Sequence, residues 1–163
     1  MELQLKPNRW SCAITSWAMA LDMPVCYAVD LIGHDGGEVV FPELAEPRCR
    51  RGHHQQELVE LAMRNGVYPT PYQVLPSLRS ECGQFSHPIY AYTIPRFEIF
   101  SDLIKSTKGV LEGQCLRCHH AVAYDHGRIF DPDGQEFTYS AKNCEAHGFY
   151  GKQLWIFNQQ GDR

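Results

Sequence analysis

Three residues in the sequence are of types that together could perform chemistry: Cys12 near its beginning, and His120 and Asp131 far along it. A thiolate is a strong nucleophile, an imidazole can take up and return its proton, and a carboxylate can fix the imidazole tautomer. Together the three groups could break an amide bond through a covalent acyl-enzyme. Whether they can meet depends on the elements that carry them.

The segment that contains Cys12 predicts a helix over residues 11–22. Four apolar residues recur at the spacing of one helix face: Ile14, Trp17, Ala18 and Leu21. With Ser11 as the N-cap, Cys12 lies in the first turn, where unpaired N–H groups and the helix dipole favour a thiolate. The alternative is a small cysteine buried in the core, which is a common position for free cysteines.

A predicted β-hairpin carries His120 and Asp131. The turn signal at residues 125–127 joins two strand candidates, 120–124 and 128–131. In that hairpin the two side chains become near cross-strand neighbours, so the carboxylate can hold one ring nitrogen and leave the other to face a thiol. The alternative is that Asp131 only starts the turn that follows it, and that His120 is a hydrogen-bonded strand histidine.

The other patterns predict helices in the first half of the chain and antiparallel strands in the second. Further helices are expected at 24–32, 53–64 and 95–105, and further strands at 89–92, from 109–111 onward and at 153–157. A long loop, 34–51, lies between the second and third helices, and His53 with His54 forms a solvated first turn of the third. We therefore expect one α+β domain over residues 1–163.

Composition and charge narrow the classes of partner. Hydrophobic residues make up 44% of the 163 residues and charged residues 21%, as in ordinary globular proteins. The net charge of −4 gives no general attraction to nucleic acid, and no apolar stretch is long enough to cross a membrane. Without an export signal, we expect a cytoplasmic protein whose seven cysteines are reduced.

Two blocks of sequence resemble the papain-like cysteine peptidases, particularly small bacterial and phage proteins related to the bacteriocin-processing (double-glycine) peptidases. The first block is 6–21, around Cys12, and the second is 113–134, around His120 and Asp131. The resemblance spans residues 4–134 and keeps the order Cys, His, Asp. It implies a helical half packed on an antiparallel sheet, a Cys12–His120–Asp131 triad, a peptide or protein substrate, and no cofactor or metal.

The sequence departs from this family at the oxyanion site. Such proteins usually have a glutamine six residues before the nucleophile, whose amide stabilises the developing oxyanion, whereas this chain has Lys6. Lysine is a flexible, strongly hydrated donor rather than a directional one. Lys6 itself, Gln4 or Asn8 could supply the donor instead. Failing these, we expect a slow enzyme or an inactive relative that acts as a binding protein.

A metal site is the competing interpretation. The pairs Cys115/Cys118 and Cys144/His147 have the close spacing of zinc ligands and could form a tetrahedral site in an interaction module. Cys115 to His119 also matches the haem-attachment pattern, which requires export and is therefore disfavoured. The simplest interpretation is a loop of reduced thiols beside the candidate base.

Overall fold

The computed structural model describes residues 1–73, 94–115 and 118–159. Within them the helices are α1 (Cys12–Ala20), α2 (Val25–Ile32), α3 (Gln55–Arg64), α4 (Ile94–Ser106) and α5 (Ala141–Ala146). The strands are β1 (Val67–Gln73), β2 (Lys108–Cys115), β3 (Cys118–Asp125), β4 (Arg128–Asp131), β5 (Gln135–Thr138) and β6 (Phe149–Gln159). They form one antiparallel sheet in the order β1-β6-β2-β3-β4-β5. The expected α+β class is confirmed.

The predicted helices form close to their expected bounds because their ends carry clear signals. Pro24 precedes α2, and Gly33 ends it in the left-handed conformation, with φ of +89°. At the start of α3 the His54 side chain accepts a hydrogen bond from a backbone N–H of the first turn. The Glu57 carboxylate accepts one from the backbone N–H of His54, which completes a capping box. The strand expected at 89–92 lies outside the described residues.

Two strands and one short helix were not expected from the sequence. Strand β1 contains Pro69 and Pro71, which argue against a strand, but among the described strands it lies at the edge of the sheet and pairs with β6 alone. Strand β5 has four residues and helix α5 has six, so their patterns are too short to recognise. These elements are defined by their neighbours rather than by their own residues.

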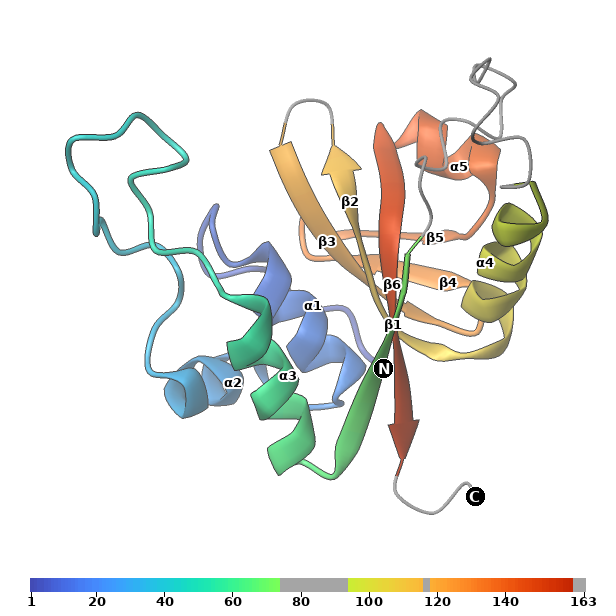
Figure 1. Ribbon diagram of the computed structural model, residues 1–163, viewed down its shortest axis with the longest axis horizontal. Coiled ribbons are helices and arrows are strands. Elements are labelled where there is room, and N and C mark those ends of the chain that lie inside the picture. Colours follow the sequence, from blue (N-terminus) through green and yellow to red (C-terminus); the bar gives the residue numbers. More distant parts are fainter. Residues whose placement is uncertain (74–93, 116–117, 160–163) are drawn as a thin grey trace.

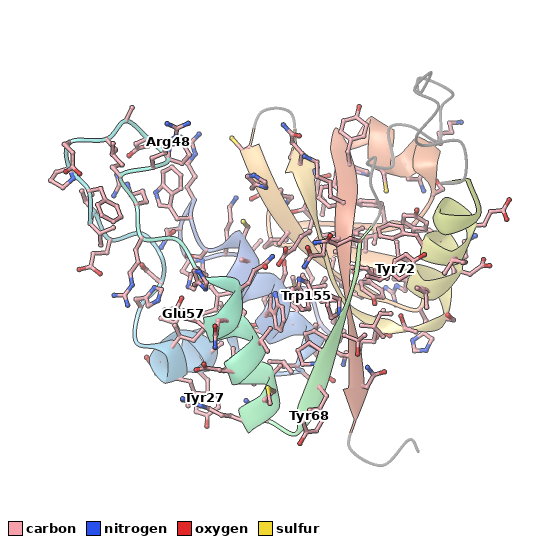
Figure 2. All side chains as sticks on the ribbon, viewed as in Figure 1. Tyr27, Arg48, Glu57, Tyr68, Tyr72 and Trp155 are labelled. Atoms are coloured by element: carbon pink, nitrogen blue, oxygen red, sulfur yellow. The ribbon has the colours of Figure 1, made fainter. Side chains whose placement is uncertain are left out.

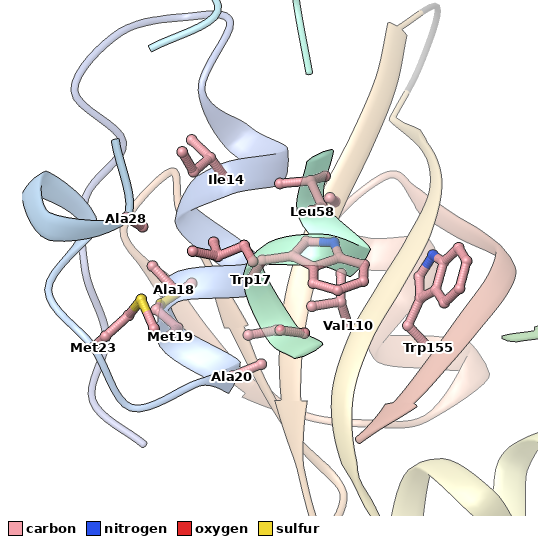
Figure 3. Packing of buried hydrophobic residues seen from close by; sticks show 14 of the residues in the cluster. Ile14, Trp17, Ala18, Met19, Ala20, Met23, Ala28, Leu58, Val110 and Trp155 are labelled. Carbon is pink, nitrogen blue, oxygen red and sulfur yellow. The ribbon is translucent and has the colours of Figure 1, made fainter. Parts of the chain in front are cut away.

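The helices cover the sheet from two sides (Figure 1): α1, α2 and α3 lie on one side, and α4 and α5 on the other. The first core joins α1, α2 and α3 to the sheet, with Trp17 fully buried and in ring contact with Trp155 at 5.5 Å (Figure 3). The second core surrounds Phe100 of α4, which contacts Tyr72 of β1. Figure 2 shows Trp155 toward α3 and Tyr72 toward α4, so the two cores lie on opposite sides of the sheet.

Helix α1 is fixed to the sheet by a buried hydrogen bond. The hydroxyl of Ser16, which is fully buried, donates to the backbone carbonyl of Ala121 in β3 at 2.8 Å. Cys12 is four residues before Ser16 and therefore lies one turn away on the same face of the helix. The bond thus brings the face that carries Cys12 against the strand that carries His120.

We expect Ser16→Ala to lower the free energy of unfolding by about 1–3 kcal/mol, because it removes a buried donor. Ser106→Ala is the matched control: this hydroxyl also donates to a backbone carbonyl, that of Asp102, but it is exposed, and its loss should cost no more than about 0.5 kcal/mol. Urea denaturation measures both. Equal losses would show that the Ser16 bond does not fix α1.

Candidate active site

Cys12 is the first residue of α1, and the helix begins without a side-chain cap. Ser11 occupies the N-cap position, but its hydroxyl donates to the carbonyl of Asp35 at 2.7 Å and makes no capping bond. The backbone N–H groups of the first turn therefore lack this side-chain acceptor beside the sulfur of Cys12. An uncapped helix N-terminus favours negative charge, whether on a thiolate or on an oxyanion held next to it.

The start of the long loop supports this helix end. Asp35 accepts from the N–H of Gly37 at 2.8 Å, and His34 accepts from the N–H of Gly36 at 3.2 Å. The other ring nitrogen of His34 lies 3.3 Å from Glu57 of α3. The loop is thereby tied to α3 on one side and to Ser11 on the other, so it forms a wall beside Cys12.

The expectation of a solvated first turn at His53 and His54 is half wrong. His54 is exposed at the N-cap of α3, as expected. His53 instead stacks on His34, with ring centroids 4.8 Å apart, and burial lowers its pKa to about 4. The close approach of Gly36 to this ring leaves no room for a β-carbon there. Nothing in the local sequence distinguishes the two histidines, because tertiary packing decides which one is covered.

His120 and Asp131 form a buried pair. His120 Nε2 lies 2.9 Å from Asp131 Oδ1, and each residue is 8% exposed. The β3–β4 ladder pairs Ala123 with Phe130, so continuing it sets Asp131 opposite Val122. His120 is two residues further along the same face, a diagonal neighbour within reach of a long side chain. Expectation and structure agree that the hairpin brings the two residues together.

Two further contacts and the turn between the strands hold the pair in place. Asp131 also accepts from the backbone N–H of Asp133 at 2.9 Å, which orients the carboxylate within its turn. The edge of the His120 ring meets Phe149 of β6, with centroids 5.9 Å apart. The turn between the strands has His126 and Gly127 at φ of 47° and 84°, as in a type I′ hairpin. The sequence signalled the turn but not the contact with Phe149.

The charges at the site stabilise one another. Burial disfavours the imidazolium of His120, but hydrogen bonds to Asp131 and Cys12 and the charges of both outweigh it and raise the pKa of His120 to about 9. For Asp131, burial acts to raise the pKa, and the bond and charge of His120 outweigh it, so the pKa is lowered. His120 is thus bonded to Asp131 and interacts electrostatically with Cys12. Since Nε2 faces Asp131, Nδ1 is the ring nitrogen left for the sulfur.

The expected oxyanion donors have other partners. The ammonium of Lys6 forms an ion pair with Asp133, and its backbone N–H donates to the Pro132 carbonyl at 3.1 Å. The Gln4 side chain donates to the Met23 carbonyl at 2.8 Å and accepts from the Val25 N–H at 2.8 Å, so it ties the N-terminal segment to the start of α2. The donors at the start of α1 are the backbone groups described above.

Asn8, the third expected donor, shapes the approach to α1. Its side-chain oxygen accepts from the N–H of Trp10 at 2.7 Å, and its backbone carbonyl accepts from Ser11 at 3.3 Å. The turn therefore leads the chain directly into the helix.

The zinc ligand set does not gather in the described part of the chain. Cys144 of α5 is buried in the core that surrounds Phe100 of α4, and His147 stacks on Phe137 with centroids 4.0 Å apart. Over residues 1–73, 94–115 and 118–159, the group of potential ligand atoms within 4.8 Å of one another is His120, Asp131 and Asp133. This group consists of the hydrogen-bonded pair His120 and Asp131 and of Asp133, which forms the ion pair with Lys6.

A scan against protein-family models and a search of curated proteins both returned no match to this chain. Taken singly, the helices of the described residues are each too short or too polar to span a membrane, although α1 and α2, bent by 113° from one another, pass the same test as a pair. What the structure defines is an α+β chain with a buried imidazole–carboxylate pair and a thiol at a helix N-terminus that interacts with the imidazole.

The buried pair predicts a pH dependence of stability. Because the pKa of His120 rises from 6.5 to about 9 on folding, its stabilising effect is complete below pH 6.5 and is lost as the pH rises to about 9. We expect the free energy of unfolding, from urea titrations, to fall over this range. In His120→Gln the fall should be smaller, and in the control His126→Gln, at an exposed histidine, it should be unchanged. Parallel curves for all three proteins would contradict the assignment.

Proposed function

We propose that this protein is a papain-like cysteine hydrolase, a peptidase, isopeptidase or amidase, in which Cys12 is the nucleophile, His120 the base and Asp131 the residue that orients the base. One observation carries the proposal: a histidine held by a buried carboxylate has its pKa raised in part by Cys12, whose thiol lies at an uncapped helix N-terminus. The order Cys, His, Asp along the chain and the α+β fold agree with the sequence resemblance.

The reaction has two stages, formation of an acyl-enzyme and its hydrolysis, and His120 transfers a proton in both. The Cys12 thiolate attacks the carbonyl carbon of an amide, and the N–H groups at the start of α1 stabilise the oxyanion. The His120 imidazolium then protonates the departing amine as the C–N bond breaks. Neutral His120 next takes a proton from water, which attacks the acyl-enzyme and releases the acid and the Cys12 thiolate, so that the starting thiolate and imidazolium are restored. Throughout, Asp131 keeps the imidazole oriented and stabilises its charged form.

A peptide or protein substrate suits the surface beside the site. The long loop that borders α1 exposes four apolar side chains: Val39, Val40, Phe41 and Leu44. Trp10, just before Cys12, lies between the guanidinium groups of Arg9 and Arg50 at 5.3 and 5.6 Å. Apolar and aromatic groups of this kind bind polypeptide, and the net charge of −4 disfavours nucleic acid. Reduced thiols fit action in the cytoplasm.

A second function, that of a binding protein on the same fold, is favoured by one observation. The ammonium of Lys6, which stands where a directional amide is expected, is neutralised by Asp133. Losing one oxyanion donor typically lowers turnover by about 10²–10³-fold. A protein of that kind would retain the cleft and bind polypeptide without cleaving it at a useful rate.

Selective alkylation tests whether Cys12 is activated. At pH 6 we expect iodoacetamide to label Cys12 well before the other six cysteines, because the helix terminus and the imidazolium favour the thiolate. His120→Ala should remove this advantage, and the neighbouring His119→Ala should preserve it. Mass spectrometry of the labelled peptides gives the order. Labelling of Cys12 at the rate of the exposed Cys26 would leave the binding protein as the better proposal.

The departure at Lys6 gives a second test. We expect Lys6→Gln to raise turnover of an acyl or peptide probe by up to about 10²-fold, because it supplies a directional amide donor. Lys6→Met removes the ammonium without adding a donor and should give no gain. If both variants lose activity equally, the ammonium is itself a working group of the enzyme.

A further inference from the structure

Two thiols that the hydrolase mechanism does not use lie at the end of the β2–β3 hairpin. Cys115 and Cys118 are direct partners in the antiparallel ladder, and both are free thiols. Opposed residues in such a ladder have Cα atoms about 4.5–5.5 Å apart, and a disulfide needs about 4.4–6.8 Å. The backbone therefore already holds the two cysteines at a separation that a disulfide can bridge.

The thiol pair borders the candidate site. Residues directly opposed in a ladder share a face of the sheet, as do residues two apart on a strand. Cys115 and Cys118 consequently share the face of His120, which follows Cys118 by two residues. The electrostatics agree with this placement: burial first, and then the charges of Asp131 and Asp133, raise the pKa of Cys115.

We propose that Cys115 and Cys118 form a reversible disulfide on reaction with a hydroperoxide, so that one wall of the site is redox-sensitive. Cys118 is the exposed thiol and Cys115 the more covered one, which assigns the order of the steps. This inference goes beyond the proposed function, since the disulfide requires neither Cys12 nor turnover.

The chemistry proceeds in two balanced steps. The Cys118 sulfur attacks an oxygen of the hydroperoxide and the O–O bond breaks, which gives a sulfenic acid on Cys118 and one alcohol. The Cys115 sulfur then attacks the Cys118 sulfur, the S–O bond breaks, and water leaves with the proton of the Cys115 thiol. Two thiols and one hydroperoxide thus give one disulfide, one alcohol and one water. A small dithiol reverses the change by exchange.

Peptide mapping of the full chain tests this directly. Arg117 lies between the cysteines, so trypsin cleaves inside the loop and leaves peptides 109–117 and 118–128 joined only by the disulfide. After treatment with hydrogen peroxide and alkylation, we expect this joined pair as the main disulfide. Once Cys118 is oxidised, the joined pair should form at least about tenfold faster than a disulfide from Cys118 to Cys26, because Cys115 is held beside Cys118. Dithiothreitol should separate the two peptides.

The variants make the result specific. Cys118→Ser should abolish the joined pair, and Cys26→Ser and Cys12→Ser should leave it unchanged. Recovery of Cys115 and Cys118 as separate alkylated peptides, with Cys26 oxidised equally fast, would overturn the inference, as would a disulfide from Cys118 to any other cysteine. If the joined pair forms but Cys12 is unreactive, the proposed hydrolase function is contradicted and the disulfide inference stands. If Cys12 is reactive but the joined pair does not form, the disulfide inference is contradicted and the hydrolase proposal stands.

Discussion

The hydrogen bond between His120 and Asp131 is the interaction on which the rest of the site depends. Both side chains are buried, and a buried charge is costly unless an opposite charge and hydrogen bonds compensate for it. Here each partner offsets the desolvation of the other, and the backbone N–H of Asp133 adds a further bond to the carboxylate. The hairpin turn and the packing of Phe149 serve to keep this pair in one geometry.

Cys12 belongs to a different part of the chain, and the packing of α1 on the sheet brings it toward the pair. The bond of Ser16 to the Ala121 carbonyl fixes the position of α1 along β3, and Trp17 packs in the core between the helix and the sheet. Ser11, which would ordinarily cap the helix, bonds to the loop instead. The same residue therefore supports the loop beside Cys12 and leaves the helix end available for negative charge.

Local signals in the sequence predicted helices α1 to α4, the hairpin and the meeting of His120 with Asp131, because caps, periodicity and turn residues act over a few positions. They could not predict β1, whose prolines oppose the strand that tertiary pairing imposes. Nor could they predict the burial of His53 beside His34 or the ion pair between Lys6 and Asp133, since each joins segments distant in sequence. The α+β class followed from element order, whereas the surroundings of each side chain followed from packing.

The prolines of β1 have a consequence for how an extended polypeptide could attach to this molecule. Pro69 and Pro71 lie two residues apart, so their nitrogens point to the same side of the strand, and neither carries a hydrogen. At those two positions this edge strand offers carbonyl acceptors but no backbone donors. An incoming strand could not complete a regular ladder along β1. A polypeptide, or a second copy of the chain, would therefore pair poorly with this edge of the described sheet.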